Sequence, residues 1–181
     1  MRVNIVREWR SPMSADATAI SQTQQPNYQA ILWGGLIAGI LDISAACATT
    51  AIRNGRGPMT VLQSVASGLL GADAYKGGAR SAAIGLALHF FIAYVWCTVF
   101  YLASRQLTVL LRNPVVSGLL YGVFVYLMMY GIVLRLTFHR NFLTPPKNVI
   151  IAVLTHMFCV GLPISLIVSR FSRERSTDER S

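Results

Sequence analysis

The chain has 181 residues, of which 54% are hydrophobic and 13% are charged, and its formal net charge is +9. So high an apolar fraction with so few charges is outside the usual range of soluble domains and indicates a single-domain membrane protein. The positive charge does not indicate nucleic acid, because the cations lie between and after long apolar segments, where lipid headgroups are the expected partner.

The first 29 residues are polar and lack the apolar core and cleavage site of a signal peptide. Residues 1–29 are therefore predicted to form a disordered tail, and the first apolar segment is predicted to act as a signal anchor. Met13 precedes the small-residue stretch "MSADA", so translation could start at Met13 rather than at Met1.

Four apolar segments follow, each close to the length of about 20 residues that crosses the core of a bilayer. They cover residues 31–52, 82–103, 115–134 and 149–168, and Asp42 is the only charged residue within them. Lipid offers the backbone no hydrogen bonds, so segments of this length without alternating polarity are predicted to be helices. We expect an all-α, integral membrane four-helix bundle over residues 30–170 and a charged tail over residues 171–181.

The connection between the first two segments is long and has its own helical pattern. Pro58 suits a first helical turn, apolar residues recur at helical spacing in "TVLQSVASGLLG", and Gly71 can end the helix. Residues 58–71 are too few to span a bilayer. They predict an amphipathic helix that lies at the membrane interface, either as a lid on the bundle or as a segment that re-enters part-way.

Small residues mark the faces through which membrane helices approach one another. Such residues recur at a spacing of four in the first three spans. They are Gly35 and Gly39 in the first, Gly85, Ala93 and Cys97 on the same face as His89 in the second, and Gly118 and Gly122 in the third. These faces predict close packing, either within the bundle or against another copy of the chain or another membrane protein.

Three ionisable residues fall inside the spans, namely Asp42, His89 and His156. At a rise of about 1.5 Å per residue, and with alternate spans antiparallel, all three lie within about one helical turn in depth. They therefore predict one polar layer inside the bundle.

Other polar residues are predicted to lie near this layer. Thr155 and Cys159 flank His156 in the fourth span, and Arg135 and His139 follow the third span on the same side. These four residues are the candidate surroundings of the polar layer.

An ionisable side chain inside a bilayer is costly, which leads to three interpretations of the layer. In the first, Asp42 accepts a hydrogen bond from one histidine and Arg135 reaches the interface. In the second, Asp42, His89 and His156 relay protons in a proton-coupled or cation transporter. In the third, His89 and His156 bind haem b or a metal, with Cys159 as a further ligand. The sequence therefore does not decide whether the chain binds haem b, a metal or no cofactor.

The chain contains no nucleophile elbow, glycine-rich phosphate loop or paired carboxylates, so we expect no catalytic activity. Arginines follow the fourth span in "SRFSRERSTDERS", which favours a cytoplasmic C-terminus and, with four spans, a cytoplasmic N-terminus.

A resemblance to a known family rests on five stretches between residues 34 and 169. They are "GGLIAGILDISAA", "TVLQSVASGLLG", "GLALHFFIAYVW", "GLLYGVFVYLMM" and "HMFCVGLPISL". Together they resemble a family of small, four-span bacterial inner-membrane proteins that is described as a domain of unknown function. The resemblance implies a bacterial inner-membrane location and four spans, and it assigns no residue a role. We expect a non-catalytic accessory or structural subunit, or a homo-oligomer, with transport and cofactor binding as the alternatives.

Overall fold

The computed structural model describes residues 28–133 and 146–178, and these contain helices and no strand. Four helices are long and apolar enough to cross a membrane: Tyr28–Asn54, Gly78–Gln106, Pro114–Ile132 and Val149–Arg173. The expected all-α membrane bundle is confirmed. The predicted N-terminal tail lies, apart from its last two residues, outside the described residues.

The first two spans are the helices α2 (Tyr28–Asn54) and α4 (Gly78–Gln106). The short helix α5 (Val109–Arg112) connects α4 to the third span, which consists of α6 (Pro114–Met128) and the π-helical turn η2 (Met129–Val133). The fourth span consists of α8 (Pro146–Thr155), the π-helical turn η3 (His156–Gly161) and α9 (Leu162–Asp178). The helix α9 thus continues well into the sequence that was expected to be a charged tail.

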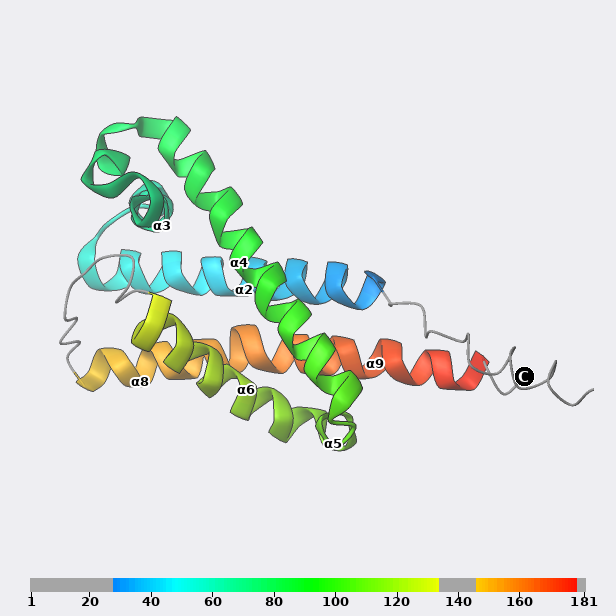
Figure 1. Cartoon of the computed structure of the whole chain (residues 1–181). Coiled ribbons are helices and arrows are strands. Elements are labelled where there is room, and N and C mark those ends of the chain that lie inside the picture. Colours follow the sequence, from blue (N-terminus) through cyan, green and yellow to red (C-terminus); the bar gives the residue numbers. More distant parts are fainter. Residues whose placement is uncertain (1–27, 134–145, 179–181) are drawn as a thin grey trace, which may run out of the picture.

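In Figure 1, the fourth span forms one continuous rod that runs antiparallel to α2, while α4 crosses both of them. The helix α6 packs along η3 and α9 on the other side of this rod. The start of α2 and the end of α9 therefore lie at the same end of the bundle, as an even number of spans requires.

The amphipathic segment after the first span forms α3 (Pro58–Leu70), followed by the 3₁₀ helix η1 (Gly71–Lys76). Pro58 occupies the first turn of α3, and Gly71, with φ of 63°, ends it, because a residue without Cβ adopts this conformation at little cost. α3 lies across the first half of α4, at the end of the bundle opposite the two termini.

A single polar side chain fixes α3 to the start of α4. The amide nitrogen of Gln63 donates hydrogen bonds to the carbonyl oxygen of Gly78 at 3.1 Å and to Oγ of Ser81 at 3.4 Å. Gln63 is only 7% exposed, so water has little access to its amide and cannot readily replace these two hydrogen bonds.

The core occupies the half of the bundle nearer the start of α2. It contains Ala30, Ala38, Cys97, Phe100, Tyr101, Val125, Val160, Ile164 and Val168. The hydroxyl of Tyr121 donates a 2.6 Å hydrogen bond to the carbonyl oxygen of Trp96, and that of Ser165 donates one of 2.7 Å to Pro114. These bonds tie α6 to α4 and α9, where lipid could not satisfy the hydroxyl groups.

Glycines determine where the helices touch. A Cβ added at Gly39 would come within 2.7 Å of the Phe90 ring, and one added at Gly35 would collide with the ring of Tyr94. Gly85 lies directly against the backbone of Leu62 in α3. The glycine faces of α2 and α4 are therefore filled by side chains and backbone of the same chain.

The third and fourth spans also pack through glycines. A Cβ at Gly118 would lie 2.8 Å from the Cα of Leu162, and Gly122 contacts the backbone of His156 and Met157. Large apolar side chains remain on the outside of the bundle, among them Leu32, Phe91 and Leu120, each more than half exposed. Such a surface suits a protein surrounded by lipid rather than by water.

The fourth span contains Pro163, and the π-helical turn η3 lies just before it. Proline has no N–H and its ring crowds the carbonyl of the preceding turn. The N–H of Leu162 accordingly bonds to the carbonyl oxygen of Met157, five residues back. Widening the helix in this way lets it pass the proline.

Candidate functional site

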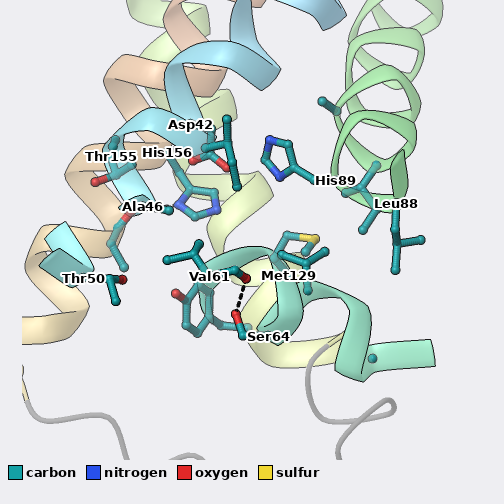
Figure 2. Close-up of a pocket in the computed structure, with 18 of the residues that line it drawn as sticks. Asp42, Ala46, Thr50, Val61, Ser64, Leu88, His89, Met129, Thr155 and His156 are labelled. Atoms are coloured by element: carbon teal, nitrogen blue, oxygen red, sulfur yellow. Dashed lines mark hydrogen bonds between the residues drawn. The ribbon is translucent and has the colours of Figure 1, made fainter. Parts of the chain in front are cut away.

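A cavity of about 1110 Å³ opens in the half of the bundle that contains α3. Its walls come from every span, with α3 and η1 at one end, as Figure 2 shows for the labelled residues. The lining of α2 extends from Ala38 to Arg53, so the cavity runs from the middle of this helix to its end. Ala38, Val125 and Val160 belong both to the cavity wall and to the core, which closes the deep end.

Asp42, His89 and His156 all line this cavity, from α2, α4 and the first residue of η3. Their side chains gather around the same space in Figure 2. The other ionisable residues in the lining are Arg53, at the last turn of α2, Tyr75 in η1 and Tyr130 in η2. Arg53 is about 16 Å along the helix from Asp42, at 1.5 Å per residue, so the two charges lie at opposite ends of the cavity.

His89 is held by the backbone of α2. Its Nε2 lies 2.9 Å from the carbonyl oxygen of Gly39, and a carbonyl oxygen only accepts, so Nε2 carries the hydrogen. The bond is possible because α2 and α4 approach closely at Gly39, where Phe90 and Ala93 pack against the bare Cα. In the neutral imidazole, Nδ1 is then an acceptor without hydrogen.

His156 is held by its own helix. Its Nδ1 lies 2.8 Å from the carbonyl oxygen of Ala152, one turn earlier, and therefore carries the hydrogen. The rings of Tyr126 and Tyr130 meet the imidazole edge to face, with centroids at 5.8 Å and 6.1 Å. In the neutral ring, Nε2 is the remaining acceptor.

Asp42 has no hydrogen bond or ion pair with any residue in the described part of the chain. The expected hydrogen bond from His89 or His156 to Asp42 is therefore not formed, because both imidazoles donate to backbone carbonyls instead. The carboxylate is half-buried and lies about midway along α2. Among residues 28–133 and 146–178 this acidic group has no partner, and it lies at the deep end of the cavity.

The remaining predicted site residues divide into three groups. Thr155 lines the cavity, and its hydroxyl donates a 2.9 Å bond to the carbonyl oxygen of Ile151. Cys159 is a half-buried free thiol that does not line the cavity. Arg135 and His139 lie outside the described residues.

Several lining residues were not predicted from the sequence. Among them are Arg53, Trp96 and Ser64. A signal for Arg53 existed, since the face of Gly35, Gly39, Asp42, Ala46 and Thr49 reaches it after one more turn. Ser64 could not be found this way, because its place depends on how α3 folds back onto α4.

A metal or haem site remains a prediction. His89 and His156 each keep one free ring nitrogen, which is what a ligand to iron needs. Within residues 28–133 and 146–178, no group of three or more His, Cys, Asp or Glu side chains converges on one point.

Comparison of the chain with models of protein families, with curated proteins and with solved structures finds no match. The resemblance to the four-span family of unknown function therefore remains a prediction. The chain is a multi-pass membrane protein by its four apolar helices, and its site has to be interpreted from its own geometry.

Proposed function

We propose that this membrane protein is a transporter that exchanges protons for a cationic solute, with Asp42 as the residue that binds both. One observation carries the proposal. Asp42 lies midway along a membrane-spanning helix, faces a cavity of about 1110 Å³ and has no hydrogen bond or ion pair with any described residue.

A charged side chain at the centre of a membrane helix costs about 2.5–3.5 kcal/mol on insertion scales, and such residues are usually neutralised by a fixed partner. Asp42 has no fixed partner among the described residues, so an ion that binds reversibly is the simplest way to neutralise it. A proton or a cation can do this, and the two compete for the same carboxylate. Such competition is the simplest way to couple one flux to the other.

The two histidines suit a route for protons to this carboxylate. An imidazole ring can both donate and accept a proton, and both rings line the same cavity as Asp42. Each ring is oriented by a bond to a backbone carbonyl, which keeps its other nitrogen available as a proton acceptor. Protons can thus be exchanged between Asp42 and the two imidazoles at the deep end of the cavity.

The cavity reaches only one end of the bundle, because the core closes the other end. We interpret this as one of two conformations that a transporter needs. In the second, the contacts around Cys97 and Val125 would separate and those around Ser64 and His89 would close.

The accessory-subunit interpretation draws less support from the structure. It depends partly on Gly35, Gly39, Gly118 and Gly122 being available to a partner. All four pack against residues of the same chain.

The proposal is tested in proteoliposomes that enclose a pH-sensitive dye. An outside addition of NaCl, KCl or 2-phenylethylguanidinium chloride is expected to drive proton release through the wild-type protein for at least one cation. The guanidinium probe stays protonated and so carries no proton through lipid by itself.

Asp42→Asn is expected to lower the rate of this release by about tenfold or more, because the amide neither binds a proton nor pairs with a cation. Asp73→Asn is the matched control, since Asp73 pairs with Lys76 on the exposed surface of η1. Equal rates in wild type and Asp42→Asn, or no cation-driven release in folded wild type, would contradict the proposal.

A further inference from the structure

Three side chains at the deep end of the cavity, Asp42, His89 and His156, present hydrogen-bond acceptors. Both imidazoles use their N–H groups on backbone carbonyls, of Gly39 and Ala152, and leave a bare nitrogen. Asp42 has only acceptor oxygens when ionised. The lining also contains donors, namely the hydroxyls of Thr49, Thr50, Tyr75 and Tyr130, the indole N–H of Trp96 and the guanidinium of Arg53.

Three hydroxyl groups of the lining also donate to backbone carbonyls. Those of Thr155, Ser64 and Ser67 each donate to a carbonyl oxygen of their own helix, at 2.9 Å, 2.6 Å and 2.7 Å. What they offer a ligand is their lone pairs. A ligand that fits this surface supplies the hydrogens itself.

The rest of the lining is apolar or aromatic. Val61, Leu88, Ile92 and Met129 come from three different elements, and the ring of Trp96 borders the deep end. Apolar walls with a few polar groups of one kind are typical of sites for organic molecules. A bare inorganic cation needs several oxygen ligands, whereas the described residues offer one carboxylate in a space of about 1110 Å³.

From these observations we propose that the cavity binds organic cations that carry N–H groups, ammonium or guanidinium, on an apolar body. The N–H groups bond to Asp42 and to the bare nitrogens of His89 and His156. The apolar body lies against the aliphatic and aromatic walls, where Trp96 and Tyr130 also favour a positive charge. This inference rests on the proposed function in its use of Asp42, yet it concerns equilibrium binding and needs no transport to be measured.

The test is isothermal titration calorimetry on the purified full chain in detergent, with three probes of nearly one shape. 2-Phenylethylguanidinium has charge and N–H groups, trimethyl(2-phenylethyl)ammonium has charge alone, and 2-phenylethanol is neutral. The first is expected to bind, the second to bind about tenfold more weakly or worse, and the third to give no measurable binding, because charge-assisted hydrogen bonds supply the difference.

Variants assign the binding to the site. Asp42→Asn is expected to lower the affinity for 2-phenylethylguanidinium by about tenfold or more, whereas Asp73→Asn leaves it unchanged. His89→Phe and His156→Phe are each expected to reduce the ratio of the affinity for 2-phenylethylguanidinium to the affinity for trimethyl(2-phenylethyl)ammonium. Asp42→Glu, which keeps the charge, retains binding and shows that a loss in Asp42→Asn is not a loss of fold.

Three outcomes would overturn the inference. Equal binding of all three probes would make the cavity a site for apolar molecules or lipid chains. Tighter binding of 3-phenylpropionate than of the cations would make it an anion site at protonated histidines and Arg53. Displacement of the guanidinium by NaCl or KCl, relative to the same concentration of choline chloride, would make it an inorganic cation site.

The two proposals fail separately. Binding of the organic cation without proton release in proteoliposomes keeps this inference and overturns the transport proposal. Proton release driven by Na⁺ or K⁺, with no binding of 2-phenylethylguanidinium, keeps the transport proposal and overturns this inference.

Discussion

At the scale of single residues, glycines determine how closely the helices of the bundle approach one another. Gly39 brings α2 close enough to α4 for its carbonyl oxygen to reach His89, and Gly85 brings α4 onto the backbone of α3. In lipid, where apolar contact drives association only weakly, such close approach is the main way for helices to gain packing.

Gly85→Ala is expected to destabilise the protein by about 1–3 kcal/mol, because the added methyl group meets backbone atoms of Leu62 and Ala66 that cannot turn aside. Unfolding by titration with sodium dodecyl sulfate measures the effect. Gly131→Ala is the matched control, since a Cβ there has no atom within 4 Å. Equal stability of the two variants would show that the contact between α3 and α4 is not tight in the membrane.

The residue scale also shows the limit of the sequence. Asp42, His89 and His156 could be assigned to one layer from their depth, and all three line one cavity. Their hydrogen bonds could not be predicted, because every imidazole has a choice between a carboxylate and any carbonyl within reach. Which one it takes depends on rotations and separations of helices to within an ångström, and a single sequence does not contain them.

At the scale of elements, α3 has an unusual position. It is too short to cross the membrane, and yet it forms part of the cavity wall. It contributes Val61, Ser64 and Val65 to the lining and is joined to α4 by the amide of Gln63. Its existence and ends could be predicted from Pro58, Gly71 and the helical spacing between them. Its placement over the cavity could not be predicted. An amphipathic pattern identifies the buried face of a helix but not the element that packs against that face.

Gln63→Ala is expected to loosen α3 while the spans remain folded, because two hydrogen bonds of a buried amide are lost. At about 0.5–1.5 kcal/mol for such a bond, amide hydrogen exchange over residues 58–70 should rise by about two- to tenfold. Met59→Ala, at a half-exposed position of the same helix, is the control. A rise spread evenly over α2, α4 and α6 would mean that Gln63 supports the whole bundle.

At the scale of the whole molecule, the bundle has two unlike halves. The half near the termini is packed around Phe100, Ile164 and Val168, which are almost fully buried, and the half near α3 contains the cavity. The number of spans could be predicted, since bilayer thickness fixes the length of an apolar helix. The unequal packing could not, because all four spans are similarly apolar along their length.

Both termini are expected to face the cytoplasm, since Arg170, Arg173 and Arg175 follow the last span. A fluorescent protein fused to the C-terminus should therefore fluoresce, and alkaline phosphatase fused there should be inactive. Phosphatase inserted into the full chain between Arg56 and Gly57 should be active. The reverse result would give more weight to Arg53, Arg56, Lys76 and Arg80, which lie on the opposite face.

The depth of Asp42 has an electrical consequence. A cation that reaches this carboxylate from the α3 face crosses about half of the bilayer, and therefore about half of the membrane potential. A full crossing changes the energy of one elementary charge by about 2.3 kcal/mol per 100 mV, so half a crossing is worth about 1 kcal/mol, or about fivefold in affinity. Occupancy of the cavity would then follow the voltage of the cell, and the sign of that dependence would report which side of the membrane α3 faces.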